Sequence, residues 1–273
     1  MKEKLISLVT VASLLSACSL YHPRSDVDTT NLGQLQGVMA GTYTGGLSGA
    51  EIGQLRYKAL EDTAMSLGAQ GGLASASQQI NVSLEKDRKH LDNIFNFNGM
   101  ILSHGVLPPV LVQGNNSLNL DDPDTIRVAD KTFKIVEQAH FVTTPPNWRD
   151  YLWLNYEKPE LPNKVLLPKT KQEHAVWSRA IALGWDRGTQ QAYSIFQQNL
   201  ARLKRDYQGM ILYRKLLQEK MINAPYVSKT ELGVTGDGND MRVNDQVLRI
   251  TEHPQLQTES NNWRAIVVKK DDY

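Results

Sequence analysis

Cysteine is almost absent from this sequence: Cys18 is the only one among 273 residues. With a single cysteine the chain forms no internal disulfide bond, so its fold depends on packing and hydrogen bonds alone. A surplus of either charge is lacking too, because 30 basic residues are matched by 29 acidic ones. Nucleic-acid-binding proteins usually carry a marked basic surplus, so we expect no direct contact with nucleic acid.

Long apolar runs are also missing, and the longest one near the N-terminus is short. After the first 17 residues, no run approaches the roughly 20 apolar residues that a membrane-spanning helix needs. Residues 5–15 form a shorter apolar stretch, which follows Lys2 and Lys4. A positive start followed by a short apolar stretch is typical of a signal peptide, so we predict that residues 1–17 are removed.

The four residues that end at Cys18, Leu-Ser-Ala-Cys, match the lipobox of bacterial lipoprotein precursors. In such precursors the cysteine thiol receives a diacylglyceryl group, and acyl chains of this kind hold a protein firmly at a membrane. Ser19 follows, with no aspartate to indicate retention in the inner membrane. We therefore expect a lipid anchor on Cys18 and a protein on the periplasmic side of the outer membrane. The alternatives are an ordinary signal peptide with an unrelated cysteine, or a short core helix.

The composition divides the remainder of the chain into two parts. Residues 18–49 contain many Gly, Ser, Thr and Asp and few large apolar side chains, which is typical of a flexible linker. Residues 50–273 are numerous and apolar enough to form a core. We predict a lipidated flexible tether over 18–49 and a single α+β periplasmic domain over 50–273.

Two long segments carry apolar residues every three or four positions, which predicts amphipathic helices. The first covers 50–103, and we expect Gly68 and the glycine pair at 71–72 to interrupt it. The second covers 171–221. Its glycines favour either a kink or the close approach of a neighbour, so one continuous helix and two helices joined by a bend both remain open.

Residues that favour strands are concentrated in 106–143 and after Tyr226. Turn residues separate them at 121–124 and 232–240, and a further strand is expected at 264–268. Helices and strands thus occur in blocks and do not alternate along the chain. This order predicts an α+β fold, with long amphipathic helices packed on a small, mostly antiparallel β-sheet.

Patterns that carry chemistry are few. Asp237 and Asp240 lie beside glycines, but the spacing does not match an EF-hand calcium loop, and a β-turn is the better interpretation. The histidines do not have zinc-ligand spacing, and His140, in a predicted strand, is interpreted as a core residue. There is no Gly-x-Ser-x-Gly nucleophile elbow. We expect no enzymatic activity, no metal and no cofactor beyond the covalent lipid on Cys18.

Aromatic residues gather in one short segment that contains Trp148, Tyr151 and Trp153. Core packing, a protein interface and a platform for stacking sugars or peptides are all open, and we consider these three residues a possible interface. A stacking platform would suit an alternative function, that of a periplasmic peptidoglycan-binding or cell-wall-modifying lipoprotein.

Eight stretches are distinctive when taken together: 61–72, 93–98, 106–110, 138–142, 147–149, 199–203, 208–210 and 232–238. With the lipobox ahead of them, they resemble the DotC lipoprotein family of type IVB secretion systems and its counterpart in I-type plasmid conjugation. The resemblance extends over roughly residues 50–255.

The resemblance implies a structural role in the outer-membrane core complex. Family members act with a small lipoprotein, DotD, to place and stabilise the outer-membrane ring protein DotH. The expected partners are therefore a DotD-like lipoprotein, a DotH-like ring protein and further copies of the same chain in the ring. The family has no catalytic residues, and only the lipidated cysteine transfers, onto Cys18.

Overall fold

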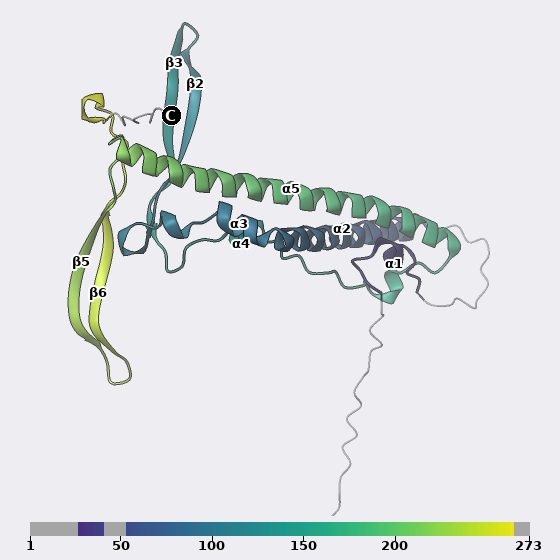
Figure 1. Cartoon of the computed structure of the whole chain (residues 1–273). Coiled ribbons are helices and arrows are strands. Elements are labelled where there is room, and N and C mark those ends of the chain that lie inside the picture. Colours follow the sequence, from purple (N-terminus) through teal and green to yellow (C-terminus); the bar gives the residue numbers. More distant parts are fainter. Residues whose placement is uncertain (1–26, 41–52, 265–273) are drawn as a thin grey trace, which may run out of the picture.

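The computed structural model describes residues 27–40 and 53–264. It is a mixed structure of helices and antiparallel strands, which confirms the predicted α+β class. Two long helices form an elongated body, and two β-hairpins project from one end of it (Figure 1).

The body consists of helix α2, Gln54–Lys86, and helix α5, Lys171–Gln218. The two lie side by side, with α2 against the N-terminal part of α5 (Figure 1). Helix α5 is continuous over 48 residues, or about 72 Å, so the alternative of two bent helices does not apply. Helix α2 is continuous as well. The expected interruption at Gly68 and at 71–72 is therefore wrong.

Glycines in both helices make contacts between the two backbones and do not break either helix. On Gly188 of α5, for example, a methyl group would overlap the carbonyl oxygen of Ala69 on α2. A glycine inside a helix costs about 0.5–1 kcal/mol relative to alanine, but tertiary packing outweighs such a propensity. Four glycines meet the opposite backbone in this way: Gly68 and Gly72 on α2, and Gly184 and Gly188 on α5.

The N-terminal described segment, residues 27–40, differs from the predicted tether. Helix α1, Leu32–Gln36, begins at the side-chain cap of Asn31 and buries Leu35 completely. The indole N–H of Trp177 on α5 donates to the carbonyl oxygen of Leu35 at 2.9 Å. This segment is folded against α5 and is not a flexible linker. The rest of the predicted tether, with Cys18, lies outside the described residues.

The strands form three separate two-stranded antiparallel sheets in place of one small sheet. The three sheets pair β1, Val106–Leu107, with β4, His140–Phe141; β2, Val110–Asp122, with β3, Thr125–Glu137; and β5, Tyr226–Gly236, with β6, Met241–Glu252. The long helices pack mainly on each other, and α5 also contacts the base of β2. The predicted strand at 264–268 lies outside the described residues except for Arg264.

Short helices connect these parts. They are α3, Arg88–Ile94; α4, Trp148–Leu152; and the 3₁₀ turns η1, Asn98–Met100, η2, Ser103–Gly105, η3, Lys164–Leu166, and η4, Ser260–Asn262. The largest buried cluster is formed by residues of α2, α4, α5 and the start of β2.

The base of the β2–β3 hairpin is fixed to the C-terminal half of α5. A methyl group on Gly209 would lie 2.6 Å from the carbonyl oxygen of Leu111, so the strand backbone rests directly on the helix. Leu111 is buried, and Arg205 forms an ion pair with Glu137 at the end of β3, with 3.1 Å between Nη2 and Oε1. The hairpin therefore has a defined direction relative to α5.

At its other end, α5 is joined to α2 by one nearly buried ion pair. Arg56 on α2 donates to Glu173 in the first turn of α5, with 3.0 Å between Nη2 and Oε2. The Glu173 side chain is 7% exposed and also accepts the backbone N–H of Lys169. The hydrogen bond from Arg56 lowers the pKa of Glu173 below its ordinary value.

The contact between glycines predicts a large effect of one added methyl group. We expect Gly188→Ala to lower the free energy of unfolding by about 3 kcal/mol, because the helix backbones must separate to accommodate the new side chain. Gly99→Ala, where no atom lies within 4 Å of the added carbon, is the matched control. Urea denaturation measures both, and equal effects of the two variants would contradict the packing described here.

The ion pair predicts a specific dependence of stability on pH. Because the pKa of Glu173 is lower in the folded state, its carboxylate stabilises the fold above the ordinary pKa of 4.5, and this contribution is lost as the pH falls through the folded pKa. In urea denaturation, the wild-type protein should lose stability more steeply than Glu173→Gln between about pH 5 and pH 3. Parallel curves would show that the ion pair contributes nothing.

Candidate functional site

Each of the two long hairpins carries a group of strongly exposed apolar side chains near its tip. Both leave the C-terminal end of α5, and β2–β3 and β5–β6 extend in opposite directions (Figure 1). Every strand in a two-stranded sheet has one edge whose N–H and C=O groups face no other strand. An isolated two-stranded hairpin is only marginally stable in water, and such edges can accept a further strand.

Near the turn of β2–β3, four apolar side chains share one face. Leu118 pairs with Val128, and Leu120 pairs with Ile126. Residues opposite each other, or two apart on a strand, point to the same side of the sheet. All four are between 60% and 69% exposed. We call these four residues the apolar quartet; an exposed apolar patch of this kind is typical of an interaction site.

The β5–β6 hairpin has a similar tip. Val234 pairs with Val243 and Gly236 with Met241, and the three larger side chains are 62–69% exposed. Its strand pairing is less regular, with two shifts in register around Gly233.

The turn between β5 and β6 is held by Asp237. Its Oδ1 accepts the backbone N–H groups of Asn239 at 2.8 Å and Asp240 at 3.0 Å, and these bonds lower the pKa of Asp237. The β-turn predicted from the sequence is confirmed. No group of three or more His, Cys, Asp or Glu side chains within residues 27–40 and 53–264 is arranged to hold a metal ion.

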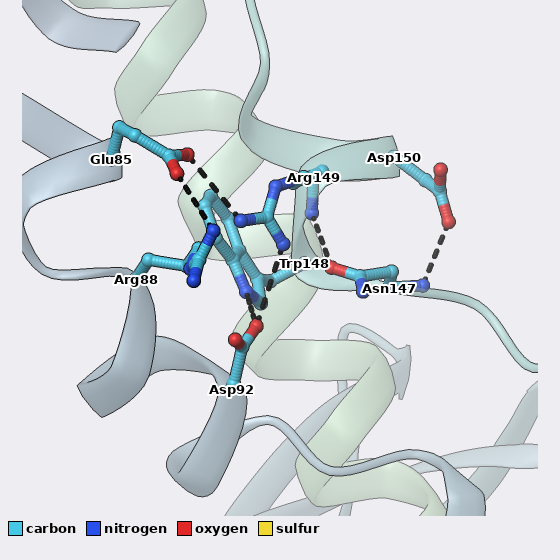
Figure 2. Close-up of polar contacts among 7 residues, drawn as sticks. All are labelled: Glu85, Arg88, Asp92, Asn147, Trp148, Arg149 and Asp150. Atoms are coloured by element: carbon cyan, nitrogen blue, oxygen red, sulfur yellow. Dashed lines mark hydrogen bonds and ion pairs between the residues drawn. The ribbon is translucent and has the colours of Figure 1, made fainter. Parts of the chain in front are cut away.

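The aromatic segment forms helix α4, which is bound to α2 and α3 by a polar network (Figure 2). Asn147 and Asp150 cap the helix reciprocally. Trp148 is 1% exposed, and its indole N–H donates to Asp92 at 2.7 Å. Arg149 stacks on the Trp148 ring at 4.2 Å and forms ion pairs of 3.4 Å with Asp92 and Glu85. Trp148 is therefore a core residue.

The other two aromatic residues of the predicted interface differ from each other. Tyr151 is partly buried and stacks on Phe97 with 6.1 Å between ring centres, and burial strongly raises its pKa. Trp153, just beyond α4, is 44% exposed. Of these three residues only Trp153 is exposed, and Tyr156 in the same segment is 39% exposed. His140, expected in the core, is exposed in β4, so that interpretation is wrong.

The sequence did not single out the apolar quartet as a site. The signal was present as alternation of apolar and polar residues on both sides of an aspartate turn, but it was interpreted only as strand structure. None of the helices that the structure describes is long and apolar enough to cross a membrane.

A helical body that carries long exposed hairpins is the arrangement of a subunit that meets other proteins. The family model described as type IV secretory system, conjugal DNA-protein transfer, matches residues 54–265. Because the match covers more than half of the chain, including both long helices and both hairpins, the chain belongs to this family and is a component of a type IV secretion or conjugation apparatus. No curated protein matches the chain.

The burial of the aromatic residues predicts different outcomes for two similar substitutions. Trp148→Ala should lower the free energy of unfolding by about 3–5 kcal/mol, because a fully buried ring and its bond to Asp92 are lost. Trp153→Ala, on the surface, should change it by about 0.5 kcal/mol or less. Urea denaturation of both variants measures this, and similar losses would contradict the different burial of the two rings.

Proposed function

We propose that this chain is a structural subunit of the core complex of a type IVB secretion or conjugative transfer apparatus. A lipid on Cys18 anchors it to the periplasmic side of the outer membrane. Together with a DotD-like small lipoprotein, it places and stabilises a DotH-like outer-membrane ring protein, and several copies take part in the ring. It performs no catalysis and needs no cofactor besides the covalent lipid.

The observation that carries this proposal is the family match over 54–265, which makes the chain part of a multi-subunit apparatus. The exposed hairpins support a structural role, because they offer apolar faces and free strand edges to neighbouring subunits. The lipobox that ends at Cys18, together with the resemblance to DotC lipoproteins, supports the anchor and the choice of partners.

Helix α1 and the two long hairpins lie at opposite ends of the body (Figure 1). Helix α1 packs at the N-terminal end of α5, and both hairpins leave its C-terminal end (Figure 1). Only eight residues, 19–26, separate Cys18 from the described segment that carries α1. Even fully extended, this link reaches about 30 Å. The lipid would therefore keep the α1 end near the membrane, while the hairpins reach partners up to about 70 Å further along α5.

The anchor is tested by Cys18→Ser in cells that carry the whole transfer apparatus, with Tyr21→Phe as a control outside the lipobox. We expect the Cys18 variant to leave the outer-membrane fraction and transfer to fall strongly, because an unlipidated chain is no longer held where the ring assembles. Membrane fractionation, gentle solubilisation with partner identification, and transfer frequency measure these effects.

In the wild type and in Tyr21→Phe, the protein should be recovered with a second lipoprotein and an outer-membrane ring protein. Recovery of the chain alone or with cell-wall fragments, together with normal transfer by Cys18→Ser, would overturn the proposal and favour the peptidoglycan-binding alternative.

A further inference from the structure

The end of the body that carries α1 also exposes several large apolar side chains. Leu55, in the first turn of α2, is 86% exposed, the highest value among the large apolar side chains that the structure describes. Val165 and Leu166 in η3 are 62% and 38% exposed, and Met39 after α1 is 45% exposed. Side chains this open contribute little to the stability of the monomer. We call these four residues the end patch.

Hydrogen bonds bring the three segments of the end patch together. Arg56, the residue after Leu55, donates from Nη1 to the carbonyl oxygen of Val165 at 3.1 Å. The residue after Met39 donates its backbone N–H to the carbonyl oxygen of Pro168, just beyond η3, at 3.0 Å. The end patch therefore lies where α2 and α5 begin, although its residues come from distant parts of the sequence.

Lysines flank the end patch. Lys164 directly precedes Val165, and Lys58 lies three residues after Leu55, which makes the two neighbours on the surface of α2. Residues 161–172, which contain η3, include no acidic residue. Four lysines of these two segments are exposed and form no ion pair with another described residue: Lys58, Lys164, Lys169 and Lys171.

Acidic residues occur at the same end, but they do not directly flank the end patch within the described chain. Glu173 is neutralised by its ion pair with α2. The first acidic residue of α2 is Glu61, six residues after Leu55, and the nearest one before η3 is Glu160, five residues before Val165. The described flanks of the patch are therefore basic or neutral.

The link to Cys18 joins the body at the same end as the patch. Val27, the first described residue, packs against the same buried cluster as Leu167, which directly follows Leu166 of the patch. Residues 19–26 separate it from Cys18 and reach at most about 30 Å. A lipid on Cys18 therefore brings a bilayer within reach of the end patch, whereas the hairpins lie at the far end of α5 (Figure 1).

We propose that the end patch lies in the surface of the phospholipid bilayer that holds the lipid of Cys18. Its apolar side chains enter the boundary between head groups and acyl chains, and the lysines beside them extend their ammonium groups to lipid phosphates. This inference rests on the proposed function and deepens it, because it adds a second membrane contact to the lipid. A lipid alone attaches the chain at one point, whereas two contacts restrict the angle at which α5 leaves the membrane.

The test measures binding of the mature chain, residues 18–273 with Cys18→Ser, to vesicles of phosphatidylethanolamine and phosphatidylglycerol. Because this chain carries no lipid, its binding comes from the protein surface. Adding Leu55→Gln and Val165→Thr should weaken binding about tenfold, because less apolar surface enters the bilayer. Co-sedimentation with sucrose-loaded vesicles over a range of lipid concentrations measures the affinity.

The matched control makes the same two exchanges at the other end of the body, Leu118→Gln with Val128→Thr on β2–β3. These side chains are 69% and 65% exposed, and their replacement should leave vesicle binding unchanged. Thermal unfolding of each variant verifies the fold. An absence of binding, or equal losses in the two variants, would overturn the proposal and leave the end patch to another subunit or to residues 41–52.

A second measurement locates the end patch relative to the bilayer in the lipidated chain. With Cys18 acylated, an introduced cysteine carries the only free thiol. A fluorophore on Val165→Cys should be quenched by lipids that are brominated in their acyl chains, whereas the same fluorophore on Val128→Cys should not. Equal quenching at the two positions would contradict the contact.

Failure of this inference and failure of the proposed function give different results. Vesicle binding that depends on Leu55 and Val165, together with normal transfer by cells carrying Cys18→Ser, would refute the proposed function and leave the membrane contact intact. A transfer defect in Cys18→Ser without such vesicle binding would refute the membrane contact alone.

Discussion

The close approach of α2 and α5 is the constraint on which the rest of the molecule depends. Four glycines place each backbone against the other, and no larger residue fits at these positions without moving a helix. Few large side chains are buried where the glycines meet. The contact is therefore stabilised by the close fit of the two helix backbones and by the buried clusters beside it. It keeps the N-terminal part of α5 in a fixed position and thereby fixes α1 at one end and the hairpins at the other.

The β2–β3 hairpin is fixed at its base, and both hairpins gain little stability along their length. The base of β2–β3 rests on α5 through Gly209, buried Leu111 and the ion pair of Arg205 with Glu137. Beyond the base, most side chains of both faces are exposed, so the tips gain little from folding the monomer. Apolar residues such as the quartet are unfavourable in water at such positions. Their presence is better explained by contact with another chain than by stability of this one.

Much of the fold follows from the sequence, and the errors have identifiable physical causes. Periodicity located both long helices and the blocks of strands, because repeats of 3.6 and 2 residues are local properties. The predicted interruption at Gly68 was wrong because the sequence does not distinguish a glycine that interrupts a helix from one that packs against a neighbouring backbone. Leu35 lies in a polar segment, and its burial depends on contacts with α2 and α5, which are far away in sequence. Trp148 and Trp153 are chemically alike, and only the fold places one inside and one outside.

The length of the helical body determines how far from a lipid anchor the hairpins can meet other subunits. With a long tether, the position of the body relative to the membrane would be loosely defined, and the hairpins would search a large volume. Because only eight residues separate Cys18 from the described segment that begins at Val27, the proposed anchor would hold one end of the helix pair within about 30 Å of the membrane. The hairpins at the far end of α5 then meet their partners over a restricted range of depth. The glycines of α5 favour a kink in the sequence, but in the structure they pack against α2 and the helix is continuous. A continuous α5 lets an anchor at one end determine where the hairpins lie at the other.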